Sequence, residues 1–145
     1  MPAWTFFDSF KTNTINGTGI IDFDTDLIKI ALITVSNVPD IDVDDFWDDL
    51  QATEVTGTNY TARGEALGSR TVAEAGGVVT FDAADVTWVS SGGGFANARH
   101  AILYFDSTVD TTSNLVATLD FGVDKGNTTG DLTIQMDSLG IITLT

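Results

Sequence analysis

Hydrophobic and polar residues alternate in several short segments of this chain. Alternation with a period of two places one face of a β-strand in a core and the other face in water. Segments of this kind occupy residues 79–81, 86–88, 132–136 and 142–144. We therefore predict a half-buried strand at each of these positions.

Longer apolar runs predict strands that are covered on both faces. Residues 27–33 read LIKIALI, with one lysine as the only polar residue, so this strand is expected inside a sheet. Residues 20–23, 98–105 and 115–121 are also predicted to be strands. Pairs such as Asn16-Gly17 and Gly76-Gly77, and the glycines of residues 92–94, mark the turns between them.

The spacing of these segments indicates the fold class. Roughly eight to ten strands recur at intervals of about 8–15 residues, the rhythm of an all-β, antiparallel β-sandwich or jelly-roll-like domain. We find no internal repeat and no linker, so residues 1–145 are expected to form one domain. The first residues either join this domain or form an extended N-terminal arm.

Helical spacing is confined to two short segments. In the first segment, four apolar residues recur at intervals of three and four, and Asp42 precedes them as a candidate N-cap. These residues are Val43, Phe46, Trp47 and Leu50. A second short helix is predicted over residues 6–12, with its three phenylalanines, Phe6, Phe7 and Phe10, buried.

Composition and charge exclude several classes of protein. Apolar residues make up 43% of the chain and aromatic residues 10%, too many for a disordered protein. The 21 acidic and 6 basic residues give a net charge of −15, which repels phosphate, so we expect neither nucleic-acid nor membrane binding. No run approaches the roughly 20 apolar residues of a membrane helix. The N-terminus lacks a signal peptide, so synthesis and folding in a cytoplasm are expected.

Two groups of aspartates are candidate metal ligands. Cysteine is absent from the chain, so no thiolate metal site is expected. Residues 40–49 hold six aspartates, but an EF-hand loop that starts at Asp40 would need glycine sixth and glutamate twelfth. Asp45 and Gln51 stand at those positions. A second group, Asp22, Asp24 and Asp26, alternates as on one solvent-facing side of a strand. We therefore predict solvated acidic surfaces and no metal or other cofactor.

No catalytic motif is present in the sequence. His100 is the only histidine, and it lies in a predicted strand, where a packed position is favoured over a role as general base. Metal-protease, nucleotide-binding and serine-hydrolase motifs are missing. The protein is expected not to be an enzyme and to have no catalytic residues. A small hydrolase or isomerase with paired carboxylates stays open as an alternative, because such partners meet in space.

The aromatic residues suggest which side chains contact a partner. Trp88 and Trp47 follow strand and helix periodicity and are predicted in the core, whereas Trp4 is the best candidate for an intermolecular contact. The segment EVTGTNYTARGEAL, residues 54–67, reads either as an arm or edge strand that lies along a partner or as an ordinary surface strand. Tyr60 and Arg63 within it are the other candidate partner contacts.

Seven sequence blocks carry a resemblance that covers nearly the whole chain. They are FKTNTINGTGIIDFDTDLIKIALIT, DFWDDL, EVTGTNYTARGEAL, VTFDAADVTW, ARHAILYFD, LVATLDFG and GDLTIQMDSLGIITL. In this order they resemble a group of small virion structural proteins of tailed bacteriophages. The resemblance implies a decoration or cement protein on the outer capsid surface, made in the host cytoplasm, and it brings no active-site residues.

The same resemblance suggests partners and an assembly state. We expect the protein to bridge neighbouring major capsid protein subunits, most simply as a homotrimer at local threefold points, with a dimer at local twofolds as the alternative. A different placement in the virion stays open: a head-fibre or tail adsorption protein that binds host surface glycans through exposed aromatic residues.

Overall fold

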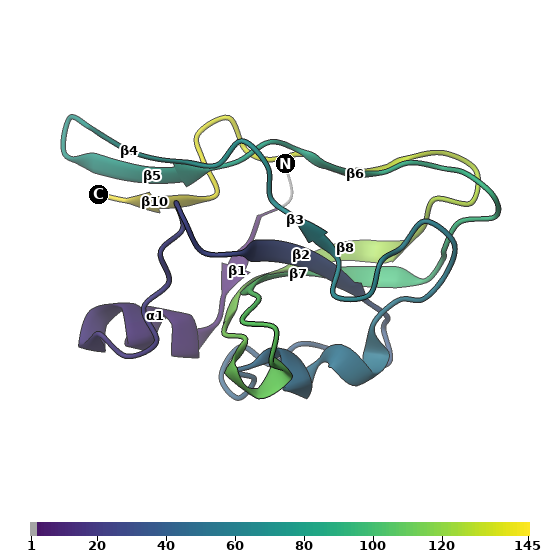
Figure 1. Ribbon diagram of the computed structural model, residues 1–145, viewed down its shortest axis with the longest axis horizontal. Coiled ribbons are helices and arrows are strands. Elements are labelled where there is room, and N and C mark those ends of the chain that lie inside the picture. Colours follow the sequence, from purple (N-terminus) through teal and green to yellow (C-terminus); the bar gives the residue numbers. More distant parts are fainter. Residues whose placement is uncertain (1–2) are drawn as a thin grey trace.

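The computed structural model describes residues 3–145 and is built mostly from β-strands in antiparallel sheets, with one short α-helix (Figure 1). This arrangement confirms the predicted all-β, sandwich-like fold class. Within residues 3–145, the single helix is neither long nor apolar enough to cross a membrane.

Three sheets form the fold. The main sheet has the order β1 (Thr5–Phe6), β8 (Leu115–Lys125), β7 (Ala98–Phe105), β2 (Ile28–Ile33), β3 (Glu65–Ala66). The second sheet has the order β10 (Ile142–Leu144), β5 (Val78–Asp82), β4 (Thr71–Ala75). The third pairs β6 (Val86–Trp88) with β9 (Leu132–Ile134). The helical elements are α1 (Asp8–Asn16) and the 3-10 turns η1 (Trp47–Asp49), η2 (Gln51–Thr53) and η3 (Asp110–Thr112).

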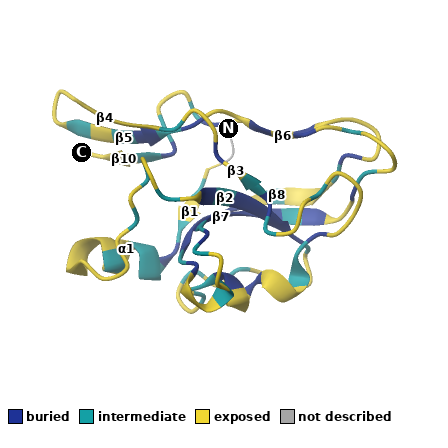
Figure 2. Cartoon of the chain, in the orientation of Figure 1, coloured by how far each residue is buried: buried dark blue, intermediate teal, exposed yellow. Residues whose placement is uncertain are grey.

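The main sheet is the middle layer of the molecule. The second and third sheets lie on one side of it, and α1 with the 3-10 turns lies on the other (Figure 1). Strands β2 and β7 are buried over most of their length, and β8 is buried over residues 115–119 (Figure 2). Because both faces of these strands are covered, their near-continuous apolar sequences are explained.

Alternate residues of the middle strands pack in two separate hydrophobic cores. On β2, Ile30 and Leu32 join the larger core below the second and third sheets. Ala31 and Ile33 join a smaller core with Trp47 on the opposite face. The side-chain period of two in a strand separates these sets.

The two tryptophans that periodicity assigns to the core are buried there. Trp88 is 2% exposed in the larger core, and Trp47 is 1% exposed in the smaller one. The Trp47 ring stacks on Tyr104 with 4.8 Å between the ring centroids. His100, predicted to be packed in a strand, lies in β7 and is 3% exposed.

The predicted helix after Asp42 is wrong. The chain makes a turn there and then the short 3-10 turns η1 and η2, in which Trp47 and Leu50 are buried while Val43 is 68% exposed. The carboxylate of Asp49 accepts hydrogen bonds from the backbone N–H groups of residues 45 and 46. Aspartates bond to nearby backbone in this way in competition with a helix.

The N-terminal helix is confirmed but begins later than predicted. Residue Phe6 belongs to β1, Phe7 is the buried N-cap, and α1 covers Asp8–Asn16. Of the three phenylalanines predicted as buried, Phe7 is fully buried, whereas Phe6 and Phe10 are half-buried. Gly17 ends the helix with a φ of 74°, and its N–H donates to the carbonyl of Asn13.

The strand predicted at residues 20–23 is also wrong. The carboxylate of Asp22 accepts hydrogen bonds from the N–H groups of Asp24 and Thr25, and that of Asp26 accepts one from the N–H of Asp22. These aspartates therefore close a turn and do not line one face of a strand. The other predicted strands are present. Strand β3 lies within residues 54–67, predicted as an arm or a surface strand, whereas β1 and β4 were not predicted.

Candidate docking groove

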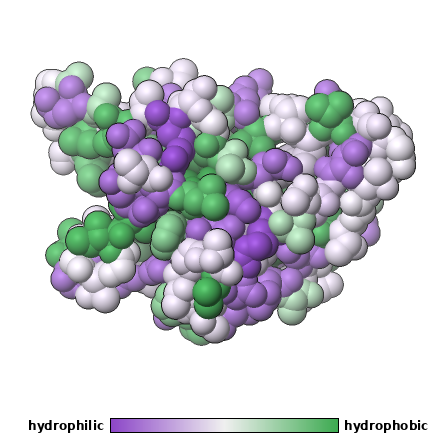
Figure 3. Space-filling model, viewed as in Figure 1, coloured by the Kyte–Doolittle hydropathy of each residue, from purple (hydrophilic) through white to green (hydrophobic). Residues whose placement is uncertain are grey.

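An apolar groove lies between α1 and the second sheet. Its volume is about 360 Å³, and Figure 3 shows hydrophobic side chains gathered where the surface is hollowed between these elements. Its lining comes from α1, the connection that follows it, and all three strands of the second sheet. The lining residues are Phe10, Lys11, Thr14, Ile15, Gly19, Ile20, Ile21, Phe23, Val72, Val79, Phe81, Ile142 and Leu144.

One wall of the groove is the apolar face of the second sheet. In the register of this sheet, Val72 and Ile142 stand opposite Phe81, while Leu144 stands opposite Val79. Residues directly opposite each other share a face in an antiparallel pair. All five side chains therefore point to one side of the sheet, the side that α1 faces.

The floor of the groove is a row of phenylalanine rings. Phe10 lies 5.9 Å from Phe23, and Phe23 lies 4.7 Å from Phe81, measured between ring centroids. Phe81 is 4% exposed and belongs to the larger core, against which Phe10 and Phe23 also pack. The floor is thus continuous with the hydrophobic core.

The outer part of the groove leaves large apolar side chains in water. Ile15 is 88% exposed, Ile20 71% and Leu144 58%. Helix α1 has no fully buried residue (Figure 2), although Phe10, Lys11, Thr14 and Ile15 lie along the side that faces the groove. Contiguous apolar surface of this kind marks sites of interaction on soluble proteins.

Three acidic residues are neighbours of residues that line the groove. Asp22 and Asp24 flank Phe23 in the sequence, and Glu74 shares the sheet face of Val79, which stands opposite it. We call Asp22, Asp24 and Glu74 the acidic rim. All three are exposed, and within residues 3–145 none of them forms an ion pair. The one cation of the groove, Lys11, pairs with Asp8.

Most basic side chains are engaged inside the molecule. Five of the six make ion pairs or hydrogen bonds to their own chain: Lys11, Lys29, Arg63, Arg70 and Arg99. Arg70 donates to the backbone carbonyls of Phe23 and Asp26 next to the acidic rim. Few cations are therefore free to balance the net charge of −15.

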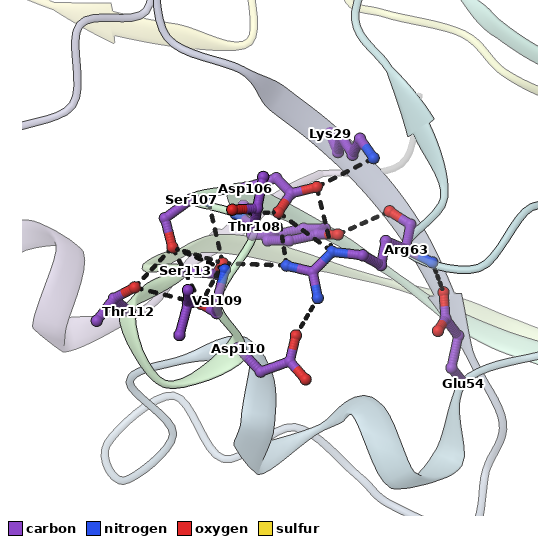
Figure 4. Close-up of polar contacts among 11 residues, drawn as sticks. Lys29, Glu54, Arg63, Asp106, Ser107, Thr108, Val109, Asp110, Thr112 and Ser113 are labelled. Atoms are coloured by element: carbon purple, nitrogen blue, oxygen red, sulfur yellow. Dashed lines mark hydrogen bonds and ion pairs between the residues drawn. The ribbon is translucent and has the colours of Figure 1, made fainter.

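Arg63, a predicted partner contact, is the centre of a polar cluster (Figure 4). Its guanidinium donates to both carboxylate oxygens of Asp106 and to Asp110, and Lys29 lies 3.0 Å from Asp106. Burial alone would raise the pKa of Asp106, but hydrogen bonds from Arg63 and Lys29 lower it to about 2. Gly64 follows with a φ of 76°, and a Cβ there would collide with the carbonyl of Ile30.

Tyr60, the second predicted contact, is tied to the same segment. Its hydroxyl accepts from the N–H of Leu32 at 2.9 Å and donates to Glu54 at 2.8 Å, while its ring packs against Phe95. Burial raises the pKa of the Glu54 carboxyl. Residues 54–67 are thus held against their own chain, with β3 as a two-residue edge strand, and a contact of Tyr60 or Arg63 with a partner stays a prediction.

Trp4, the third predicted contact, is half-buried against the larger core. It precedes β1, where Thr5 pairs with Thr118 and Phe6 with Ala117, so this part of the N-terminus is attached to the main sheet. Residues 1–2, the start of the proposed arm, lie outside the described residues. A role of Trp4 in assembly stays a prediction.

A second pocket, of about 320 Å³, is lined mostly by polar residues, and we call it the polar pocket. It is lined by Ser9, Asn13, Thr18, Gly19, Asp45, Phe46, Thr112 and Asn114. Within residues 3–145, the carboxamides of Asn13 and Asn114 have no hydrogen-bond partner. Hydroxyl and amide groups around an aromatic ring are suited to a neutral polar ligand such as a sugar.

The two pockets do not bring carboxylates together. Lys11 is the only charged residue that lines the groove, and Asp45 is the only one that lines the polar pocket. Asp8 and Asp42 lie together on the surface, where the hydrogen bond and charge of Asp8 raise the pKa of Asp42. The described residues contain no group of three or more His, Cys, Asp or Glu side chains arranged to hold a metal.

The comparisons with known proteins identified no relative. No protein-family model matches the chain, and none of the curated proteins or solved structures matches it.

The residues that line the groove were not predicted as a site from the sequence. The one available signal was the apolar pair Ile20-Ile21 followed by Asp22, a pattern that predicts part of a strand.

Proposed function

We propose that this chain is a non-enzymatic bacteriophage virion protein that decorates and cements the assembled capsid by bridging neighbouring major capsid protein subunits. The resemblance of its seven sequence blocks to small virion proteins supports the proposal. The observation that carries it is the apolar groove between α1 and the second sheet, a surface built for contact with another macromolecule.

The physical basis of cementing is avidity. A small protein that touches several subunits at once gains effective concentration for each weak contact. A ligand that binds only the assembled lattice stabilises that lattice by mass action. Self-association as a trimer at local threefold points, or as a dimer at local twofolds, would multiply the contacts further. Internal DNA pressure pulls the subunits apart, and these contacts oppose it.

The charge distribution is compatible with this role on the outer capsid surface. A net charge of −15 keeps free copies soluble at high concentration and apart from DNA. Docking through the groove buries apolar surface and leaves most aspartates in water, where they carry no desolvation cost.

The test is a co-sedimentation titration with undecorated, expanded capsids. The protein should bind to saturation at a fixed ratio to the major capsid protein, with little affinity for unassembled subunits. Decorated particles should then release DNA at a higher temperature than bare particles. Binding to tail tips or host cells, with none to capsids, would overturn the proposal.

The polar pocket favours one alternative function, adsorption to host surface glycans. Asn13 and Asn114 offer amide groups that no hydrogen bond within residues 3–145 engages, beside the half-buried ring of Phe46. A glycan array with the purified protein tests this alternative. Binding that Asn114→Ala abolishes, while Asn59→Ala (an amide outside the pocket) leaves it intact, would support adsorption.

A further inference from the structure

The groove and its acidic rim together define the chemistry of an occupant. We infer that the groove binds an apolar segment of a partner protein that carries lysine or arginine on either side of its apolar residues. The inference deepens the proposed function, on which it rests for the identification of the partner as the capsid protein.

The floor and walls of the groove require apolar side chains in the occupant. Phe10, Phe23 and Phe81 form the floor, and only Thr14 and Lys11 bring polar side-chain groups. A volume of about 360 Å³ lies within the range of specific binding pockets. An occupant with polar groups at its centre would lose its hydrogen bonds to water and find almost none here.

The acidic rim requires positive charge at the ends of that segment. Asp22, Asp24 and Glu74 are exposed and form no ion pair with the residues that the structure describes, and Lys11 is already paired with Asp8. Across an interface, opposite potentials favour the correct partner and like charges exclude others. Lysines or arginines that flank the apolar residues would lie beside these carboxylates.

The edges of the second sheet favour a polypeptide as occupant. Strands β4 and β10 are the two ends of this sheet, so each has a neighbour on one side only. Their outer edges present unpaired backbone N–H and C=O groups next to the groove, and an extended peptide can pair with such an edge. A lipid or another amphiphile has no backbone to do so.

A second copy of this chain is a poor match for the groove. It would bring the same acidic rim and another charge of −15. Of its basic side chains, five are held by their own chain. Association of two copies through this groove would therefore place uncompensated carboxylates against each other.

The first experiment compares two synthetic peptides that share an alternating Leu-Ile centre and differ only in their ends, two lysines or two glutamates on each side. In fluorescence anisotropy, the lysine peptide should bind at least tenfold tighter at low salt. The difference should shrink as sodium chloride rises, because rim charges are screened. Equal affinity of the two peptides would overturn the inference.

Substitutions at Ile20 separate the apolar and the electrostatic contributions. Ile20 is 71% exposed, so its replacement should leave folding intact, which circular dichroism would verify. Ile20→Lys should weaken the lysine peptide more than Ile20→Glu does, since both remove the apolar contact but only one repels the peptide. The control is Val123→Lys, at a valine that is 59% exposed and does not line the groove.

Charge reversal of the rim gives the sharpest test. The pair Asp24→Lys and Glu74→Lys should reverse the preference, so that the glutamate peptide binds tighter. The matched pair Asp48→Lys and Asp124→Lys changes the net charge equally at exposed positions outside the groove and should keep the original preference. The same response to both pairs would overturn the inference.

Capsid binding distinguishes failure of this inference from failure of the proposed function. If wild-type protein and Ile20→Lys decorate capsids equally, the proposed function stands and the groove assignment falls. If the lysine peptide binds but capsids do not, the groove assignment stands and the proposed function falls. Analytical ultracentrifugation adds one further check, because a dimer that Ile20→Lys dissociates would show a second copy in the groove.

Discussion

The side chains of the Arg63 cluster are paired with one another, whereas those of the outer groove lie uncovered in water. In the cluster, charged side chains that are largely removed from water form ion pairs: Arg63 with Asp106 and Asp110, and Lys29 with Asp106. At the groove, large apolar side chains such as Ile15 and Ile20 remain in water without a cover. The difference indicates that the cluster holds the fold together, whereas the outer groove contributes little to folding and is left for the binding that we propose.

The groove itself divides into a floor and an outer part. Phe81 is buried and packs in the larger core, whereas Ile20 extends into solvent. Substitutions should therefore have large effects on stability at the floor and at the Arg63 cluster, and small ones at the outer residues of the groove.

The largest effect is expected at the floor. Phe81→Ala should lower the free energy of unfolding by about 3–5 kcal/mol, because truncation of a buried aromatic ring leaves a cavity. Val79→Ala, on the same face of β5 but 37% exposed, is the control and should cost less than half as much. Urea unfolding measures both, and similar small costs would remove the distinction between floor and outer groove.

The Arg63 cluster should follow closely. Arg63→Ala leaves Asp106, with a side chain 2% exposed, with Lys29 and the N–H of Thr108 as partners. It should cost about 3 kcal/mol, as expected when a buried ion pair loses one partner. Arg99→Ala breaks an ion pair with the more exposed Asp120 and should cost less than about 1 kcal/mol. Thermal and urea unfolding measure both variants. Equal stabilities of the two variants would contradict the prediction that Arg63→Ala is the more destabilising.

The cluster should also impose a pH dependence on stability. The pKa of Asp106 falls from its ordinary 3.8 to about 2 on folding, so its contribution is complete above pH 4 and is lost as the pH falls through 2. At roughly 1.4 kcal/mol per pKa unit, the loss is about 2 kcal/mol. The difference in unfolding free energy between wild type and Asp106→Asn, measured from pH 5 to pH 2, should shrink by this amount. A constant difference would show that the ion pair is not the source.

The smallest effect is expected at the outer groove. Ile20→Lys should change the free energy of unfolding by less than about 0.5 kcal/mol, because the side chain is 71% exposed and packs little. The same variant should lose most of its affinity for the lysine peptide. A destabilisation comparable to that of Arg63→Ala would mean that the outer groove belongs to the core.

The sequence predicted those strands whose burial on one or both faces leaves a periodic pattern in their own residues. The apolar runs of β2 and β7 and the alternation around Trp88 indicated strands correctly, since a strand covered on one or both faces leaves this signature in its own residues. Trp47 is buried as predicted, although the helix on whose periodicity that prediction rested is replaced by 3-10 turns.

The errors have a common physical cause. Residues 20–23 look like a strand, but the carboxylates of Asp22 and Asp26 bond to nearby backbone and close a turn. Strand β4 went unnoticed because all five of its residues are exposed, so its sequence lacks the pattern that burial imposes. Pairing with β5, a neighbour in the chain, decides its structure.

The candidate site was beyond the reach of sequence patterns. Its lining residues belong to α1, the following connection, β4, β5 and β10, and each of these segments shows only one to four of them. The sequence predicts Arg63 as a partner contact. In the structure its side chain is hydrogen-bonded to Asp106, a residue far away along the chain.

The sequence by itself determined the class of the fold, strands β2, β7 and β8 of the main sheet, the burial of Trp47 and Trp88, and the strongly acidic charge. Tertiary structure alone decided that α1 faces the apolar side of the second sheet across a groove, and that Arg63 turns inward to Asp106. The reason is range: periodicity and composition act on neighbouring residues, whereas a groove or an ion-pair cluster exists only after distant segments have packed.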